Sequence, residues 1–448
     1  MHEMKERWNV GQASSVTTAT TVDAKAPAST SVQRSIYPIG EVPPIGVVPE
    51  QMHAIVVRQQ RYGAPSQAFQ IEQLPVPTVG KRQVLVQVMA AGVNFNGVWA
   101  ARGMPVDVIG YRQRLGHSED FHIPGSDASG VVWAVGSEVR KWRIGDEVVI
   151  STSRFDPYAD DILMGATPSL SASAQAWGYE TNYGSFAQYT LVDDYQCHPK
   201  PTRLSWAQAA SYMLCGGTAY RQLMGWHPNT VRPGDPVLIW GGAGALGTMA
   251  IQITRQAGGI PIAVVSDEAR SEYCLRMGAK GVINRSEFTH WGRLPDVDDA
   301  QAMKAWLEQV RGFGRKFWAI LGDKRGAKIV LEHPGEATLP TSLYLCEPGG
   351  MVVLCGATSG YNGDLDLRFL WMRQKRLQGS HGAELCEYAA LNALVAQGAI
   401  EPCMSLAVDF HETGKLHDQM ARNQSPPGNV AVLVGATRAD AGAKAATA

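Results

Sequence analysis

The stretch VLIWGGAGALGTMAIQITRQAG (237–258) decides the fold of this chain. An apolar run ends in the pattern Gly242-x-Gly244-x-x-Gly247 and passes directly into a helix-forming run. In such a unit Gly242 permits the tight turn, Gly244 lets a pyrophosphate approach the backbone, and Gly247 lets the helix pack close to the strand. The amides at the helix N-terminus then face the phosphates. The stretch therefore predicts a dinucleotide-binding turn.

On the C-terminal side of this stretch, apolar runs alternate with helical ones. The runs are IPIAVVS (260–266), EYCLRMGAKGVINRS (272–286), KIVLEHPG (328–335) and GGMVVLCGATSG (349–360). Alternating strands and helices are typical of a parallel, doubly wound sheet. The sequence thus predicts an α/β protein with a Rossmann-type domain over residues 215–384.

On the N-terminal side, short β-branched runs separated by Gly and Pro indicate a β-rich domain over residues 51–214. Helix and strand patterns after the Rossmann-type segment predict that residues 385–437 return to this first domain. Residues 1–50 are rich in Ser, Thr, Ala and Pro and predict an extended arm. Residues 438–448 are expected to form a disordered tail.

The composition of the chain narrows its class. Its 448 residues are 45% hydrophobic and 18% charged, with a formal net charge of -1. This balance argues against nucleic acid or a membrane surface as the partner, because both require clustered Lys and Arg. No apolar run approaches the roughly 18 residues that span a bilayer. The seven cysteines are scattered and odd in number, which favours reduced thiols in a cytoplasmic protein.

The choice of coenzyme depends on the end of the second predicted strand. Ser266, Asp267 and Glu268 follow that strand, with Arg270 close behind. An acidic residue would favour the ribose hydroxyls of NAD, whereas Ser plus Arg suits the 2′-phosphate of NADP. Arg270 and the later Arg285 favour NADPH, although each could instead lie on a solvated face.

Several strings of this chain resemble the crotonyl-CoA carboxylase/reductase family of the medium-chain dehydrogenase/reductase superfamily. The resemblance extends from about residue 50 to 435. It is carried by NFNGVW (94–99), WGYETNYGSFAQY (177–189), GGTAYRQL (216–223), LIWGGAGALG (238–247), EHPG (332–335), SGYNGDLDLRFLWMRQKR (359–376) and GSH (379–381). It implies a GroES-like catalytic domain beside the Rossmann-type domain, and a homotetramer built as a dimer of dimers.

The resemblance also implies the reaction. NADPH reduces a 2-enoyl-CoA by hydride addition to C3, and C2 of the resulting enolate attacks CO2 to give an alkylmalonyl-CoA. Without CO2, protonation gives the plain acyl-CoA. Such a site must hold CO2 beside C2 and keep water away, because water would protonate the enolate.

Zinc-binding members of the superfamily carry a metal-binding Cys, a Gly-His-Glu turn and a four-Cys lobe. Here the corresponding turn is Pro124-Gly125-Ser126-Asp127, and no CxxC pair occurs. Without thiolate or imidazole ligands at tetrahedral spacing, the chain offers no ligand set for zinc. We therefore expect no metal site.

Four residues match the catalytic positions of the family. Asn96 matches the Asn whose amide holds CO2, and His381 matches the His that holds CO2 through a water. Glu180 matches the carboxylate that orients this water. Tyr179 stands where the family usually has a shielding Phe, so we expect carboxylation to persist with more reduced by-product. The alternative roles are turn capping for Asn96, a structural role for His381 and a surface carboxylate for Glu180.

Three further residues match substrate-binding positions. Arg368 and Phe369 match an Arg and an aromatic residue that receive the adenine of CoA from a neighbouring subunit; otherwise they are helix-packing residues. Gly382 stands where crotonyl-specific members usually have Phe. A missing ring frees space for several methylenes, each worth roughly 0.8 kcal/mol when buried, so we hypothesise an enlarged acyl pocket. Other residues could refill the gap.

The remaining expected coenzyme contacts belong to the same quoted strings: Thr218, Ala245, Leu246 and His333. His333 could also be purely structural. Two other functions stay open: an NADPH-dependent enoyl-thioester or quinone reductase without carboxylation, and a non-catalytic dinucleotide-binding protein. The presence of Asn96, Glu180 and His381 together argues against both.

Overall fold

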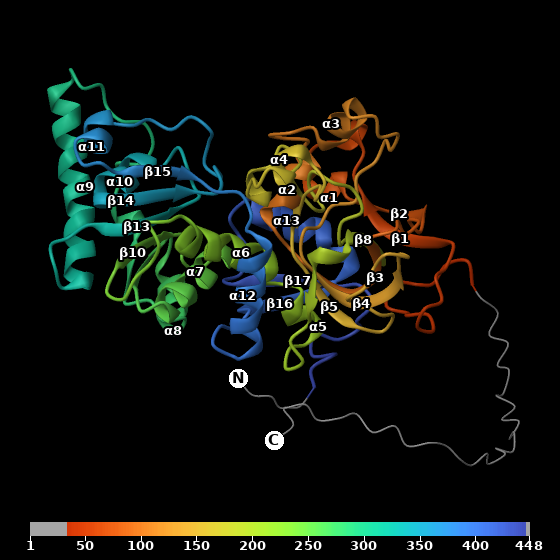
Figure 1. Ribbon diagram of the computed structural model, residues 1–448. Helices are drawn as coiled ribbons and strands as arrows, with labels where there is room; N and C mark the ends of the chain where they lie inside the picture. Colours follow the sequence, from red (N-terminus) through yellow and green to blue (C-terminus); the bar gives the residue numbers. More distant parts are fainter. Residues whose placement is uncertain (1–33, 445–448) are drawn as a thin grey trace, which may run out of the picture. The chain divides into compact units, whose positions relative to one another are not determined.

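The computed structural model describes residues 34–444, and within the chain from Ser35 onward two main sheets form one compact unit (Figure 1). Residues 1–33, which make up most of the predicted arm, lie outside the described residues. The rest of that arm lies along the first sheet, where the Val47 carbonyl accepts a hydrogen bond from Trp133 Nε1 at 2.8 Å.

The first sheet has seven strands in the order β16-β17-β3-β4-β5-β9, with β8 also paired to β3. Successive residues of its long strand β3 (Gln83–Gly92) enter opposite cores: Val84 and Val86 pack with Trp177, whereas Leu85 packs with Trp133. This alternation follows from the two-residue period of a strand. The other strands of the sheet are β4 (Ala128–Val135), β5 (Glu147–Ile150), β8 (Tyr189–Asp193), β9 (Cys197–Pro199), β16 (Met404–Asp409) and β17 (Asn429–Leu433).

Two short hairpins accompany this sheet. They are formed by β1 (Gln51–Val56) with β2 (Gln70–Pro75), and by β6 (Ser153–Arg154) with β7 (Gln175–Ala176). The second hairpin closes a long excursion of the chain between its two strands. Both of its strands contribute to the cavity described below.

The second sheet has six parallel strands in the order β12-β11-β10-β13-β14-β15. In β10 (Pro236–Trp240), Ile239 enters one core and Leu238 and Trp240 enter the other. Helices therefore cover both faces, as the parallel pairing requires. The other strands are β11 (Ile260–Val265), β12 (Gly281–Asn284), β13 (Ala327–Glu332), β14 (Cys346–Leu354) and β15 (Arg376–Gly379).

Helices α7 (Ala245–Gln256) and α9 (Ala300–Leu321) belong to opposite faces of this sheet, since Met249 joins one core and Phe313 the other. The remaining helices are α1 (Pro65–Ala68), α2 (Phe95–Arg102), α3 (Val108–Arg114), α4 (Asp160–Leu163), α5 (Trp206–Ala209), α6 (Met213–Tyr220), α8 (Ser271–Arg276), α10 (Leu339–Leu345), α11 (Leu367–Trp371), α12 (Leu385–Ala396) and α13 (Thr413–Ala421). Helix α6 continues into a π-helical turn, Arg221–Gly225. Single 3-10 turns occur at Gln59–Arg61, Pro168–Leu170, Asp194–Gln196, Glu268–Arg270, Arg285–Glu287 and Phe410–Glu412.

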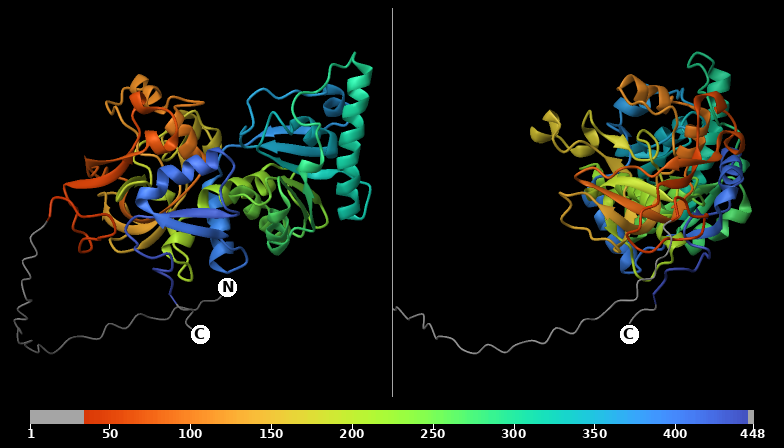
Figure 2. Two further views of the ribbon diagram at one scale, coloured as in Figure 1. Left: turned by 180° about the vertical axis from the view of Figure 1, so that it is seen from behind. Right: turned by 90° about the vertical axis from the view of Figure 1, so that its right-hand side faces the viewer.

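The chain rejoins the first sheet later than residue 385. Leu391 and Val395 of α12 enter the same core as Met249 of α7, so this helix packs with the second sheet. Strands β16 and β17 and helix α13 return to the first part, and Figure 2 shows these blue strands beside the orange strands of the first sheet. Helix α12 is apolar around most of its surface, and the same core also contains Leu204 of the first part, so the boundary predicted at residue 385 stays a prediction.

The predicted tail also differs from the structure over residues 438–444. The Trp206 N–H donates to the Ala441 carbonyl at 2.8 Å, and Lys200 Nζ donates to the Gly442 carbonyl at 2.9 Å. These bonds hold the segment against the first sheet; residues 445–448 lie outside the described residues. Across residues 34–444, no helix has the length and apolar character needed to cross a membrane.

Candidate active site

The predicted glycine turn joins β10 to α7, but its left-handed residue is Gly241, with φ of +58°, rather than Gly242. The tight turn predicted at Gly242 therefore includes its neighbour Gly241. A Cβ on Gly242 would lie 2.6 Å from that of Ala263, so this glycine lets the turn pack on β11. A Cβ on Gly247 would lie 2.4 Å from the Gly241 carbonyl oxygen. Helix α7 therefore begins in direct contact with the turn.

The space above the turn is open. A Cβ on Gly244 would meet only one atom within 4 Å, the Gly241 carbonyl oxygen at 3.3 Å. The amides of Ala245 and Leu246 open the helix, and both residues line a cavity of about 540 Å³. This cradle of bare backbone at a helix N-terminus fits the pyrophosphate of a dinucleotide.

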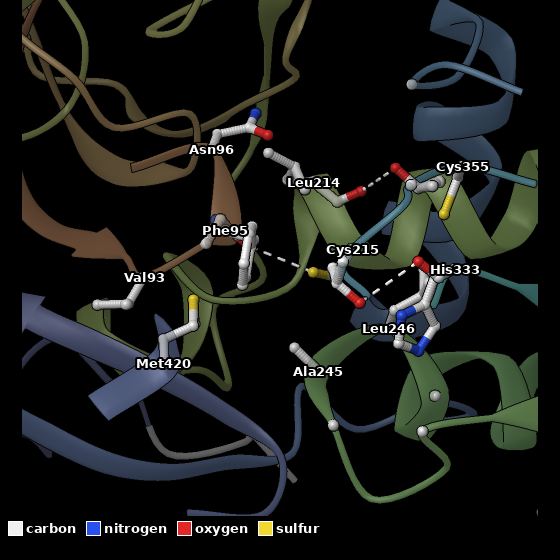
Figure 3. Close-up of a pocket in the computed structure, with 18 of the residues that line it drawn as sticks. Val93, Phe95, Asn96, Leu214, Cys215, Ala245, Leu246, His333, Cys355 and Met420 are labelled. Atoms are coloured by element: carbon white, nitrogen blue, oxygen red, sulfur yellow. Dashed lines mark hydrogen bonds between the residues drawn. The ribbon is translucent and has the colours of Figure 1, made fainter. Parts of the chain in front are cut away.

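Residues of both sheets line this cavity. Figure 3 shows Phe95 and Asn96 of α2 facing Leu214 and Cys215 of α6, with His333 and Cys355 farther to the right. Thirteen of the predicted site residues line it: Asn96, Tyr179, Thr218, Gly244, Ala245, Leu246, Gly247, Ser266, Arg270, Arg285, His333, His381 and Gly382. Four do not: Glu180, Gly242, Arg368 and Phe369.

The acidic residue after β11 is turned away from the cavity. The Asp267 carboxylate forms an ion pair with Arg270 Nε at 3.0 Å, and Arg270 Nη2 donates a hydrogen bond to the Ser425 carbonyl at 3.1 Å. Ser266 and Arg270 line the cavity, whereas Asp267 does not. This arrangement offers a hydroxyl and a cation, which suits a 2′-phosphate better than free ribose hydroxyls.

Arg285 provides a second cation on the same side. Its guanidinium stacks 4.9 Å from the ring centre of Trp291. Burial lowers the pKa of Arg285 below its ordinary value, yet a guanidinium stays protonated in proteins. Arg270 and Arg285 together therefore give this end of the cavity positive charge.

His333 packs beneath the glycine turn. Its Nε2 lies 3.1 Å from the Trp240 carbonyl oxygen, and a Cβ on Gly241 would lie 2.5 Å from the same nitrogen. Burial lowers the pKa of His333 to about 4. The imidazole is therefore neutral and supports the turn while it lines the cavity.

At the other end of the cavity, Asn96 occupies the first turn of α2. Its Nδ2 donates to Ser126 Oγ at 3.3 Å. Ser126 comes from the turn that would carry a zinc ligand in metal-binding relatives of the superfamily. In the part of the chain from residue 34 to 444, no three His, Cys, Asp or Glu side chains gather as a metal site.

Tyr179 belongs to an aromatic wall. Its ring lies 6.1 Å from that of Trp99, which in turn lies 5.3 Å from Phe95. The residue is 7% exposed, and burial raises the pKa of its hydroxyl well above the ordinary value. The neutral phenol therefore forms part of a continuous aromatic surface on this side of the cavity.

The structure does not bring Glu180 to the cavity. Its Oε2 accepts a hydrogen bond from the Ala176 N–H at 2.6 Å, within its own turn. This bond occupies one oxygen of the carboxylate and holds the turn on which Tyr179 stands. The role predicted for Glu180, orienting a water molecule, stays a prediction.

His381 and Gly382 enter the cavity from the loop after β15. Ser153 Oγ donates to the Ala383 carbonyl at 2.6 Å, and the Ser169 N–H donates to Glu384 Oε1 at 3.1 Å. These bonds tie the loop to the hairpin β6–β7 and its excursion. Gly382 has a φ of +61°, a conformation that favours glycine.

Arg368 and Phe369 lie on α11, away from the cavity. Arg368 is half exposed and paired with Asp366 at 2.7 Å, and Phe369 packs edge-on against Tyr344. They do not meet the other predicted residues within this chain, which leaves their expected contact with a neighbouring subunit's ligand as a proposal.

Sequence reasoning missed several parts of the cavity. They are Phe155, Tyr388, the loop of Gly356, Thr358 and Ser359, and the segment from Met420 to Gly428. Thr218 was expected, and its hydroxyl donates to the Leu214 carbonyl at 2.8 Å. The loop lies in one of the quoted strings, but nothing in the sequence of the 420–428 segment marks it.

Family models match both parts of the chain. The alcohol dehydrogenase GroES-like domain matches residues 80–202, and the zinc-binding dehydrogenase model matches residues 245–397. The crotonyl-CoA carboxylase/reductase of Cereibacter sphaeroides is 46% identical over 91% of this chain and 93% of its own length.

Solved structures agree with this similarity. The crotonyl-CoA carboxylase/reductase AntE, in complex with NADP, is 59% identical, with a TM-score of 0.87 over 90% of this chain and 100% of its own. The 2-octenoyl-CoA carboxylase reductase CinF, in complex with NADP and 2-octenoyl-CoA, is 35% identical, with a TM-score of 0.81 over 89% of this chain and 91% of its own.

Proposed function

The chain belongs to the crotonyl-CoA carboxylase/reductase family, and we propose that it acts on a 2-enoyl-CoA with a longer acyl chain than crotonyl-CoA. The predicted family, two-domain α/β fold and NADPH dependence are confirmed. The reaction is reductive carboxylation of a 2-enoyl-CoA to an alkylmalonyl-CoA. NADPH, when bound, supplies the hydride for C3 of the enoyl chain.

We assign Asn96 to CO2. The amide Nδ2 carries two hydrogens, of which one goes to Ser126 Oγ at 3.3 Å and one is left for an oxygen of CO2. C2 of the enolate forms a bond to the carbon of CO2, and the electron pair moves to oxygen as a carboxylate. A donor already held in place stabilises this charge without having to reorient.

The aromatic wall slows protonation of the enolate, so that the enolate can react with CO2. Phe95, Trp99 and Tyr179 line the cavity beside Asn96, so a proton source has little room to enter. In this proposal Glu180 acts through the turn it holds, and His381 faces the cavity from the opposite loop. Both are positioning or binding groups around the CO2 site.

One observation carries the proposed chain length: Gly382 leaves the cavity wall without a side chain. The nearest atom to a Cβ on Gly382 would be Ser153 Oγ at 3.2 Å, followed by Tyr388 Oη at 3.8 Å. The residue that follows in the loop, Ala383, also has a small side chain. Each methylene buried here gains roughly 0.8 kcal/mol.

The test is an NADPH-oxidation assay on crotonyl-CoA and 2-octenoyl-CoA, with and without bicarbonate, with products identified by mass. We expect kcat/KM for 2-octenoyl-CoA to equal or exceed that for crotonyl-CoA, and a dicarboxylic product when bicarbonate is present. A strong preference for crotonyl-CoA would overturn the enlarged pocket. Only reduced product at saturating bicarbonate would favour an enoyl-CoA reductase.

We also propose a homotetramer, a dimer of dimers, in which Arg368 and Phe369 receive the adenine of a neighbouring subunit's CoA. Their helix α11 carries the exposed side chains of Leu367 and Trp371, and the chain then enters β15, the edge strand of the second sheet. Exposed apolar side chains and unpaired sheet edges are both common contacts between subunits.

Native mass spectrometry tests this assembly. With a chain mass of 48.4 kDa, we expect a species of four chains and a dimer on partial dissociation. A monomer or a stable dimer at micromolar concentration would contradict the proposal. We further propose a cytoplasmic location, since all seven cysteines are free thiols; recovery of the protein from a secreted or periplasmic fraction would refute it.

A further inference from the structure

Glu332, the last residue of β13, is a fully buried carboxylate that does not line the cavity. It accepts hydrogen bonds from the Gly335 N–H at 3.1 Å and from Thr338 Oγ1 at 2.7 Å, and a short one from Ser342 Oγ. Burying a carboxylate is costly unless donors surround it. Three donors from one loop and one helix indicate that the loop is built around this group.

The carboxylate is also tied to the glycine turn. Ser342 Oγ accepts from Trp240 Nε1 at 2.7 Å, and the Trp240 carbonyl oxygen lies 3.1 Å from His333 Nε2. Trp240 ends β10 immediately before Gly241. Through Ser342 and Trp240, Glu332 therefore connects the end of β10 to the segment His333–Gly335. His333 makes a second connection from this segment to Trp240.

A second loop depends on the first. The Thr358 N–H donates to the His333 carbonyl at 3.2 Å, and the Ser359 N–H and Oγ donate to the Pro334 carbonyl at 2.8 and 2.6 Å. Thr358 and Ser359 line the cavity, as do His333 and Pro334. One buried carboxylate thus supports two adjoining parts of the cavity wall.

The strand order tells which half of the coenzyme meets these loops. Ser266, Arg270 and Arg285 follow β11 and β12, on one side of β10, and mark the 2′-phosphate end. Strands β13 and β14 lie on the other side of β10. A dinucleotide whose pyrophosphate lies over the turn after β10 must place its nicotinamide half over the loops after β13 and β14.

We propose that Glu332 is a positioning residue that fixes the loops 333–335 and 355–359 for the nicotinamide half of NADPH. It acts through the Gly335 amide and the Thr338 and Ser342 hydroxyls, and touches neither coenzyme nor acyl substrate. Burial raises the pKa of Glu332 to about 7, because desolvation disfavours the charged form and the surrounding donors offset only part of this cost. Removing it leaves the Gly335 N–H without its acceptor and frees the loop.

The experiment measures NADPH affinity directly, by the change in coenzyme fluorescence on binding, with no acyl substrate present. We expect E332A to weaken the Kd for NADPH about tenfold or more. E332Q keeps an acceptor for Gly335 and is expected to lose less. The matched control is E347Q, which removes a carboxylate paired with Lys328 at 3.7 Å, at the start of β14 and outside the cavity.

A merely structural role would lower the melting temperature of E332A and leave the Kd of the folded fraction unchanged, and that result would overturn the proposal. If E332A does not fold, the NADPH affinities of E332Q and T338V test the proposal instead. A wild-type Kd for NADPH in both variants would overturn the proposal as well. Since the acyl substrate is absent, the outcome is independent of chain length and of carboxylation.

Discussion

Replacing Asn96 by leucine is expected to turn the enzyme from a carboxylase into a simple reductase. Leucine has the same branching at Cγ as asparagine and is somewhat larger, so the wall that excludes water stays closed while the N–H donor is lost. Donors preset for a developing oxyanion contribute on the order of 10² to 10³ in rate. We expect the ratio of carboxylated to reduced product to fall by at least tenfold, with NADPH oxidation reduced by no more than about threefold.

The measurement is product analysis by mass at saturating bicarbonate, with 2-octenoyl-CoA as the substrate. The matched variant is Ser126→Ala, which leaves Asn96 in place but removes the oxygen that receives its Nδ2 at 3.3 Å. We expect this variant to fall between the wild type and N96L, because the amide is then free to turn. An unchanged product ratio in N96L would remove Asn96 from the CO2 site.

The sequence was most informative where a pattern has one physical cause. The alternation of Val84, Leu85 and Val86 between two cores requires only a strand with different cores on its faces. Glycines between an apolar run and a helical run likewise predict the dinucleotide turn. The packing of α12 could not be predicted this way, because a helix that is apolar around most of its surface does not tell which of two cores it will enter.

Within the site, sequence strings located most cavity residues but not their hydrogen-bond partners. Glu180 was expected to orient a water molecule, but it does not line the cavity, and its Oε2 accepts a hydrogen bond from the Ala176 N–H at 2.6 Å. The left-handed residue of the turn is Gly241, although the pattern starts at Gly242. Both outcomes depend on local backbone geometry, which the residue types at these positions do not determine on their own. The network around Glu332 joins residues from three elements, and no spacing along the chain marks it.

Filling the gap at Gly382 is expected to reverse the proposed preference for long acyl chains. Phenylalanine at this position would project into the cavity wall beside Ser153 and Tyr388. 2-Octenoyl-CoA carries four more methylenes than crotonyl-CoA, which at roughly 0.8 kcal/mol each amount to about 3 kcal/mol. Loss of that burial corresponds to about a 200-fold lower kcat/KM for the octenoyl substrate.

Backbone strain must be separated from the filling of space in this test. Gly382 has a φ of +61°, so any side chain is strained there. Gly382→Ala carries the same strain and the same Cβ, 3.2 Å from Ser153 Oγ, but no ring. We therefore expect both variants to lose similar activity on crotonyl-CoA, and only Gly382→Phe to lose the octenoyl substrate selectively. Parallel losses on both substrates in the two variants would show that the acyl chain does not reach Gly382.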